Sequence, residues 1–267
     1  ERLDRRLGTD FLRGGWAGVG IARALAPSRF HAVRTVAAGV LLGTNRWKRP
    51  VRLLLSAGGR PVPFVVPDLP ALKVLAEVFV LDQYEDVWPG EPRAIVDLGA
   101  HVGASALFLR GRYPDARIVC VEASPALLPI LRHNTAALGV EVRHAAVAAR
   151  SGTVTFYESP QSWTGSLARS AIADSPVSVP TVTLDALLLD DVDLVKMDIE
   201  GSEFEIVPAA TRLDQPAAYM GEIHAPPDDP RTAEFLAAFE GYLTVTEDYG
   251  ASTLFRATRA DPARRRP

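Results

Sequence analysis

Four polar side chains stand where apolar runs of the sequence end, and their types suit cation binding and proton transfer. Asp97 closes the run RAIVD, Glu122 closes RIVCVE, and Asp198 and His224 come directly after DLVKM and AAYMGEI. Carboxylates at such points attract positively charged ligands, and an imidazole titrates near neutral pH and can act as a general base. These residues therefore indicate a site for a cationic ligand at which a proton is moved.

A glycine turn follows the first of these runs. Gly99 and Gly103 lead from RAIVDLG into a helical pattern, and glycines there let the backbone approach a ligand closely. Glu122, about 20 residues further on, can accept hydrogen bonds from both hydroxyls of a ribose. The spacing Gly99-x-x-x-Gly103 lacks the third glycine of a dinucleotide site, and Asp97 would repel a pyrophosphate but favour a sulfonium. Both details favour S-adenosylmethionine over a nicotinamide dinucleotide.

The elements that must position these residues alternate between strands and helices from residue 93 onward. Five apolar runs separated by helical patterns predict βαβ units and a mostly parallel sheet. The runs are continuously apolar, as a sheet covered on both faces requires. Two β-rich runs near the C-terminus predict an antiparallel edge. The predicted fold class is α/β, a doubly wound Rossmann-like sheet whose ligands bind beyond the carboxyl ends of the strands.

The charge of the chain is divided unevenly along its 267 residues. Residues 1–60 contain 12 Lys or Arg and 3 Asp or Glu, whereas the remainder contains 17 and 29, although the formal net charge is only -3. We interpret residues 1–60 as a basic helical N-terminal cap, residues 61–260 as the ligand-binding domain, and residues 261–267 as a tail.

The cap contains a helical stripe of apolar residues at Val33, Val36, Ala37, Val40 and Leu41. We expect this stripe to pack on the acidic body or on a second copy of the chain, as in a homodimer. Contact with a membrane surface is the alternative. Nucleic acid is not an expected partner, because the body of the chain is acidic.

Composition excludes several classes of protein. The single cysteine, Cys120, lies in an apolar run, so neither a disulfide framework nor a multi-cysteine zinc site is expected. The start of the sequence lacks the apolar region of a signal peptide, and the apolar stretch at residues 36–43 is too short to span a bilayer. We therefore expect a cytoplasmic protein.

Several motifs together resemble the FkbM-type S-adenosylmethionine-dependent methyltransferases. They are VDLGAHVGAS, VEASP, VTLDAL and DLVKMDIEGSEFEIV, within about residues 60–225, and the string K-x-D-x-E-G-x-E from Lys196 to Glu203 is the most specific. The resemblance implies a class I methyltransferase fold and methylation of a hydroxyl on a sugar, a polyketide, or another secondary metabolite or glycolipid. A nicotinamide-dependent oxidoreductase and a non-catalytic binding protein on the same fold are the alternatives.

The resemblance also implies a cofactor site. Residues at the strand ends would surround S-adenosylmethionine: Asp97, Gly99, Ala100, His101, Gly103, Glu122, Ala123, Ser124, Ala146, Val147 and Asp198. Glu122 would bind the ribose, and Asp198 would lie between the sulfonium and the acceptor. Family members commonly have Asn at the position of His101, so only the backbone of this residue is expected to act.

Catalytic and acceptor-binding roles follow from residue type. His224 is the first candidate for the general base, Asp198 is its rival, and Lys196 would neutralise nearby carboxylates. Acceptor binding is expected at three further residues: Glu200, Glu222 and Trp163. No metal is expected, because the spacing of metal-binding motifs is missing, although Asp198, Glu222 and His224 offer ligands that Mg²⁺ would take.

Overall fold

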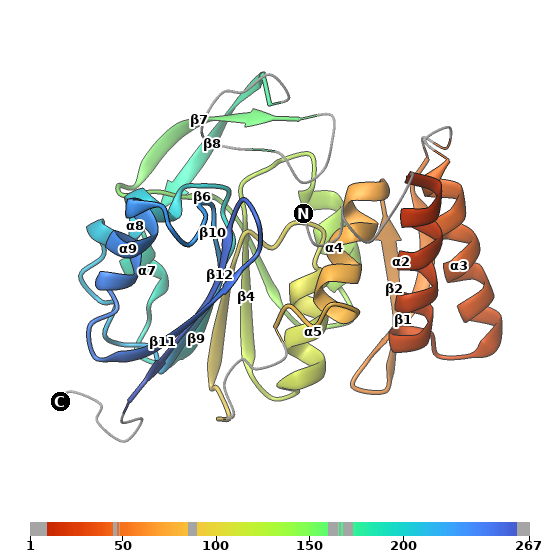
Figure 1. The fold of residues 1–267 in the computed structure, drawn as a ribbon, viewed down its shortest axis with the longest axis horizontal. Helices are drawn as coiled ribbons and strands as arrows, with labels where there is room; N and C mark the ends of the chain where they lie inside the picture. The colour runs from red at the N-terminus through yellow and green to blue at the C-terminus, as the bar shows by residue number, and fades with distance from the viewer. Residues whose placement is uncertain are drawn as a thin grey trace.

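A computed structural model describes residues 10–44, 47, 49–84, 90–159, 165, 167 and 173–260. Its centre is a seven-stranded sheet in the order β11-β12-β10-β9-β3-β4-β5 (Figure 1). The strands are β3 (Ala94–Leu98), β4 (Arg117–Glu122), β5 (Glu141–His144), β9 (Val192–Met197), β10 (Ala218–Ile223), β11 (Tyr242–Asp248) and β12 (Thr253–Arg259). Strands β5, β4, β3, β9 and β10 run parallel, and β12 is antiparallel to both β10 and β11. The predicted class I methyltransferase topology with an antiparallel edge is confirmed.

Helices cover both faces of this sheet because alternate strand residues point to opposite sides. On one face, α4 (Leu69–Phe79), α5 (Ala104–Arg112) and α6 (Leu128–Thr135) share a core with strand residues such as Ile95 and Cys120. On the other, α7 (Leu184–Leu187), α8 (Glu203–Ala209) and α9 (Pro230–Ala237) pack with residues such as Val96 and Leu98. Cys120 is fully buried, as expected of a small apolar side chain.

One helix begins later than its sequence signals predict. Ser124 and Pro125 suggest the start of α6, but the helix begins at Leu128. Ser124 is engaged elsewhere: its amide donates to Glu122 Oε1 at 2.7 Å, and its hydroxyl donates to Glu158 Oε1 at 2.9 Å. The residues in between form a turn that leaves the end of β4 open to a ligand.

A second, three-stranded sheet stands above the carboxyl ends of the main strands in Figure 1. Its order is β6-β8-β7, with β6 (Ala146–Val147), β7 (Gly152–Glu158) and β8 (Ser175–Val182). Most of the segment between β7 and β8, including Trp163, lies outside the described residues, so the expected role of Trp163 stays a prediction.

The N-terminal part is a helix pair and a β-hairpin. Helices α2 (Asp10–Leu25) and α3 (Arg29–Gly43) pack together, and β1 (Val51–Ala57) pairs with β2 (Arg60–Val66) across a turn at residues 58 and 59. Gly58 and Gly59 in that turn have φ of 54° and 79°, a region that glycine adopts without strain. One continuous core joins α2, the hairpin, α4 and the main sheet. The boundary at residue 60 stays a prediction.

The apolar stripe predicted on α3 does not pack on the body. Its residues Val33 and Leu41 are 70% and 40% exposed. The buried face of α3 consists instead of small residues and one leucine: Thr35, Ala38, Gly39, Leu42 and Gly43. Glycines make this face the tighter one, because α2 approaches so closely that a Cβ on Gly39 would lie 2.2 Å from the carbonyl oxygen of Gly14. The spacing of the large apolar residues alone therefore does not identify the buried face of α3.

Candidate active site

A cavity opens beyond the carboxyl ends of β3, β4 and β9, where the direction of chain progression in the sheet reverses. Most of the predicted cofactor residues line it: Gly99, Ala100, His101, Glu122, Ala123, Ser124, Ala146, Val147 and Asp198. Other lining residues were not singled out from the sequence, among them Val78 at the end of α4, Tyr84, and Glu158 on β7.

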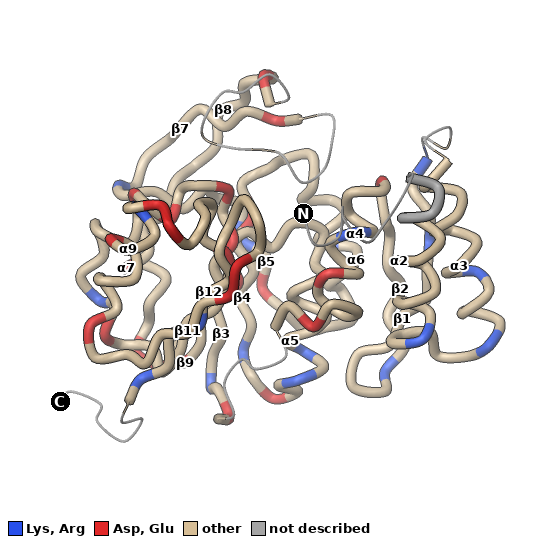
Figure 2. The backbone as a smooth tube through the Cα atoms, viewed as in Figure 1, with Lys and Arg blue, Asp and Glu red and all other residues tan. Residues whose placement is uncertain are grey.

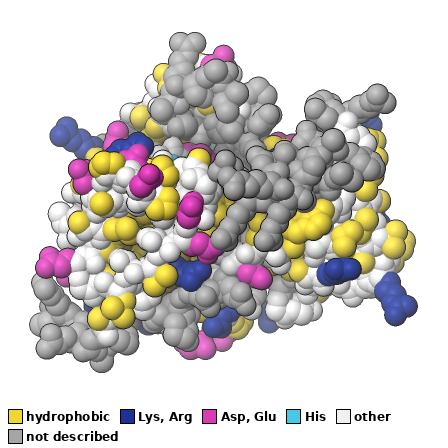
Figure 3. Space-filling model, in the orientation of Figure 1, with side chains coloured by type: hydrophobic (Ala, Val, Ile, Leu, Met, Phe, Trp, Pro, Cys, Tyr) yellow, Lys and Arg dark blue, Asp and Glu magenta, His cyan; other side chains and the backbone are white. Residues whose placement is uncertain are grey.

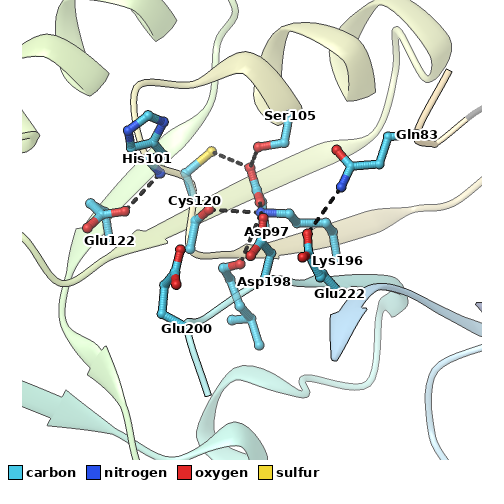
Figure 4. A network of polar contacts seen from close by, with 12 residues as sticks. Gln83, Asp97, His101, Ser105, Cys120, Glu122, Lys196, Asp198, Glu200 and Glu222 are labelled. Atoms are coloured by element: carbon cyan, nitrogen blue, oxygen red, sulfur yellow. Dashed lines mark hydrogen bonds and ion pairs between the residues drawn. The ribbon is translucent and has the colours of Figure 1, made fainter. Parts of the chain in front are cut away.

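Asp97 lies beneath the cavity and does not line it, which differs from the expected place at the methionine end of the cofactor. Its fully buried carboxylate accepts from Ser105 Oγ at 2.6 Å and pairs with Lys196 Nζ at 3.3 Å (Figure 4). Lys196 is 2% exposed and also donates to the carbonyl of Gly99 at 2.8 Å. Burial alone would lower the pKa of Lys196, but the carboxylates of Asp97 and Asp198 outweigh it and raise the pKa. The ion pair therefore supports the turn above it.

The turn itself depends on backbone freedom at Gly99. Its φ is +74°, and an added Cβ would lie 1.8 Å from the carbonyl oxygen of Asp198. His101 also has a positive φ, 52°, and its amide donates to Glu122 Oε2 at 2.8 Å. Gly103, with φ +94°, precedes α5. The backbone of this turn thus lies against both neighbouring strand ends, as the glycine spacing suggested.

Glu122 is held in a fixed orientation at the end of β4. It is 7% exposed, and its two oxygens accept from the amides of His101 and Ser124. Burial raises the pKa of Glu122, and the backbone hydrogen bonds oppose part of that increase. Each carboxylate oxygen has a second lone pair, so the group can still accept from a diol. Glu158, which the sequence did not single out, accepts from Ser124 Oγ and from the amide of Ala126 at 3.0 Å.

His224 is surrounded by carboxylates. Its Nδ1 lies 3.1 Å from Glu203 Oε1, and its Nε2 lies 3.5 Å from Glu200 Oε2 and 3.8 Å from Asp198 Oδ1. Glu203 is fully buried and also accepts from the backbone amides of His224 and Gly201. The conformation of the turn at Glu200, with φ 54°, brings these groups together.

This environment changes the expected role of His224. Burial alone would lower its pKa, but the hydrogen bond to Glu203 and the charges of Glu203, Asp198 and Glu200 raise the pKa to about 10. The residue is therefore an imidazolium at neutral pH, and the expectation that it titrates near neutrality is wrong. An imidazolium has no lone pair with which to accept a proton.

Carboxylates outnumber the cations at this end of the sheet. Burial raises the pKa of Glu200 to about 8, with His224 opposing and Asp198 adding to the increase. Burial and the charges of Glu222 and Asp198 also raise the pKa of Glu77, on α4, to about 8. Glu222 accepts hydrogen bonds from Gln83 Nε2 at 3.5 Å and from Ser252 Oγ. Its pKa is raised, mainly by burial and next by the charge of Asp198. Of the predicted acceptor residues, Glu200 lines the cavity and Glu222 does not.

Asp198, Glu200 and His224 have donor atoms within 4.8 Å of one another, so their fit to a divalent cation can be tested. The two carboxylates are suitable ligands. His224 would first have to lose the proton on Nε2, which its raised pKa opposes. We derive no step through a metal.

Solved structures resemble the chain at low identity, with TM-scores below 0.5. A precorrin-6y C5,15-methyltransferase from Geobacter metallireducens is 13% identical, with a TM-score of 0.43, over 67% of this chain and 86% of that one. A predicted O-methyltransferase from Agrobacterium tumefaciens is 16% identical, with a TM-score of 0.40, over 66% and 78%. TYW2 of P. horikoshii, in complex with MeSAdo, is 11% identical, with a TM-score of 0.43, over 79% and 72%. No curated protein matches the chain.

The family is shown by a match along the chain itself. The model of the methyltransferase FkbM domain matches residues 97–250, more than half of the 267 residues. The matched segment begins at Asp97, beneath the cavity, and contains the Lys196 pair, the Glu200 turn and His224. The chain therefore belongs to the FkbM family and is an S-adenosylmethionine-dependent methyltransferase.

Proposed function

We propose that this methyltransferase acts on a hydroxyl oxygen of a sugar, a polyketide, or another secondary metabolite or glycolipid. One observation carries the proposal: the same cavity is lined at one end by Glu122, a carboxylate suited to a diol, and at the other by the carboxylates of Asp198 and Glu200. A ligand with a ribose and a sulfonium matches both ends. A nicotinamide dinucleotide would place a pyrophosphate near those carboxylates, which disfavours it.

The cofactor site follows from the positions of the lining residues. Glu122 accepts from the ribose hydroxyls, and Ala123, Val147 and Phe156 supply apolar surface for the adenine ring. The amides of the turn at Gly99 stand beside the amino-acid end, held there by Lys196 from below. S-adenosylmethionine supplies an electrophilic methyl carbon when it is bound, so the protein needs to position the acceptor and remove one proton.

Asp198 is the general base in this proposal. Its Oδ2 lies 3.8 Å from Lys196 Nζ and its Oδ1 lies 3.8 Å from His224 Nε2, and its side chain is 28% exposed. The two cations keep the carboxylate oriented, and its exposure lets an acceptor hydroxyl reach it. His224 is a positioning residue that holds Asp198 and Glu200, and is itself held by Glu203. In the transfer, the acceptor oxygen would bond to the methyl carbon as the bond from that carbon to the sulfonium sulfur breaks. S-adenosylhomocysteine would leave, and Asp198 would take up the hydroxyl proton.

The acceptor is expected on the side of the cavity nearest Glu200, Glu222 and Gln83. Acidic and amide groups of this kind accept and donate hydrogen bonds to polyhydroxylated molecules. Trp163 stays a predicted wall of the acceptor site. A small-molecule acceptor is the partner that this arrangement supports.

Calorimetric titration with S-adenosylmethionine and with NADH tests the cofactor. We expect binding of the first only, and tight binding of NADH alone would overturn the proposal. Glu122→Ala should weaken cofactor binding, since it removes the acceptor for the ribose hydroxyls.

Turnover with a panel of hydroxylated acceptors tests the reaction. Asp198→Asn should weaken cofactor binding and, at saturating cofactor, lower kcat by about 100-fold or more, the range of general-base catalysis. His224→Gln should lower kcat less. Cofactor binding without turnover across the panel would instead indicate a binding protein, and wild-type kcat in Asp198→Asn would remove it as the base.

A further inference from the structure

Large apolar side chains are exposed on the outward side of the α2–α3 pair. Phe30, Val33 and Leu41 on α3 are 66%, 70% and 40% exposed, and Trp16 and Val19 on α2 are 39% and 37% exposed. We call these five residues the apolar face. Figure 3 shows hydrophobic side chains gathered over this end of the molecule, with Lys and Arg at the margin.

The two helices form one surface at this face. Between them, a Cβ on Gly15 would lie 3.7 Å from Cγ2 of Val40, which is ordinary van der Waals contact. Gly15 is the neighbour of Trp16, and Val40 lies two helical turns from Val33 along the same side of α3. The exposed side of α2 therefore continues across this contact onto the exposed side of α3.

The helix pair places its small residues inside and its large apolar residues outside. A Cβ on Gly14 would lie 2.1 Å from the carbonyl oxygen of Gly39, and one on Gly18 would lie 3.0 Å from that of Thr35. Helices on a protein surface in water normally turn their large apolar residues inward. Helices surrounded by lipid show the opposite arrangement: small residues lie between the helices, and large apolar residues face outward.

These helices are not built to cross a bilayer. Within the ranges that the structure covers, no helix is both long enough and apolar enough to span one. An apolar face on a surface helix pair with basic flanks instead suits the boundary between lipid headgroups and acyl chains.

The positive charge of this N-terminal region indicates what kind of partner the apolar face would bind. Residues 11–67 contain nine Lys or Arg and no Asp or Glu, and the charged residues that are coloured along α2, α3, β1 and β2 in Figure 2 are Lys or Arg. Arg23, Arg29 and Arg34 are exposed beside the apolar face, and Arg34 lies 5.8 Å from the ring of Phe30. Two copies meeting through this face would bring like charges together, whereas an anionic surface would be attracted.

We propose that the apolar face docks on an anionic membrane surface. Trp16, Phe30 and Val33 enter the boundary between headgroups and acyl chains, and Arg23, Arg29 and Arg34 contact lipid phosphates. None of the residues of the apolar face lines the cavity, so docking at this face is independent of the acceptor and of the reaction.

The test is sedimentation of the full chain with vesicles of phosphatidylcholine alone or mixed with phosphatidylglycerol, at low and high salt. We expect binding to the mixed vesicles at low salt, and its loss at high salt. Phe30→Ser with Val33→Ser, and separately Arg29→Gln with Arg34→Gln, should each lower the partition coefficient by about tenfold or more.

Matched controls are Leu243→Ser on β11, since Leu243 is also 66% exposed, and Arg132→Gln on α6, an exposed arginine far along the chain from the face. Both should bind like the wild type, and circular dichroism should show equal helix content in all variants. Wild-type protein that stays in the supernatant with mixed vesicles would overturn the proposal.

Two other occupants of the face give different results. A wild-type homodimer that Phe30→Ser with Val33→Ser converts to monomer, without vesicle binding, would identify a subunit interface. Salt-sensitive binding to an RNA duplex that the same double variant leaves unchanged, again without vesicle binding, would identify a polyanion site. Either result would overturn the proposal.

Discussion

Cofactor binding should release protons, because a cationic ligand enters a site whose carboxyls are partly protonated. With a pKa of about 8, Glu200 carries about 0.8 proton at pH 7.5 by the titration relation. A positive charge within a few ångströms of a carboxylate lowers its pKa by about 1–3 units. If the pKa falls to about 6.5, Glu200 keeps about 0.1 proton, so about 0.7 proton leaves the site.

Calorimetry in buffers of different ionisation enthalpy measures this number directly. The observed binding enthalpy of S-adenosylmethionine, plotted against the ionisation enthalpy of the buffer at pH 7.5, should have a slope of about -0.7 or steeper, since Glu77 adds to the release. The slope should approach zero below about pH 5.5, where the carboxyls stay protonated in both states.

Substitution identifies the source of the protons. Glu200→Gln should make the slope less negative by about 0.7, and Glu205→Gln, an exposed glutamate on the same helix end, should leave it unchanged. A wild-type slope of zero at pH 7.5, or the same slope in Glu200→Gln, would show that the site is not short of positive charge. That result would refute the electrostatic argument for the cofactor's position.

Three further substitutions test the supporting structure. Lys196→Met should lower the free energy of unfolding by about 3–5 kcal/mol, measured with urea, because it leaves the buried Asp97 carboxylate without its cation; a smaller loss than in Lys73→Met, at a half-buried lysine on α4, would contradict the pairing. Gly99→Ala should abolish cofactor binding and lower Tm, since its Cβ would overlap the backbone carbonyl of Asp198, just after β9; unchanged affinity would show that the turn is not closely fitted. Stability should fall as pH rises from about 4.5 through 8, by about 1.4 kcal/mol per unit of pKa shift, because the folded-state pKa of Glu77 is raised. In Glu77→Gln this fall should be smaller, and an unchanged pH profile would argue against a shifted Glu77.

The main sheet could be predicted because each strand is a continuous apolar run that ends in a polar residue. A buried parallel strand has both faces covered, so its sequence signal does not depend on the rest of the fold. The ends of β3, β4 and β9 then locate the cavity, and Glu122 and Asp198 lie in it as their positions suggested. The antiparallel edge was also predictable from its two β-rich runs.

Features that depend on long-range packing could not be predicted. Nothing in the sequence near Asp97 shows that Lys196, about a hundred residues away, would cover it from a neighbouring strand. The protonation of His224 depends on Glu203 being fully buried, which follows from the turn between β9 and α8. Glu158 approaches Ser124 only because β7 belongs to a second sheet.

The α3 helix shows a different limit of sequence reasoning. Hydrophobic periodicity found a stripe, and the stripe exists, but it faces outward because glycines on the opposite side allow a closer helix contact. Packing density competes with apolar area when a helix pair chooses its interface. A hydrophobic pattern that scores glycine as neutral therefore does not predict which face of α3 is packed.

The uneven charge of the chain separates the acidic domain that contains the cavity from the basic N-terminal helices. Because the pKa values of Glu77 and Glu200 are raised, the folded protein loses stability as the pH rises toward neutrality, so the burial of these two carboxyls is not explained by stability. A cationic ligand would recover that free energy, which makes the cavity selective for a charged cofactor over its neutral product. The basic N-terminal helices differ, because their arginines are exposed beside apolar side chains. An anionic membrane surface, as proposed above, would pair with these arginines from outside the chain.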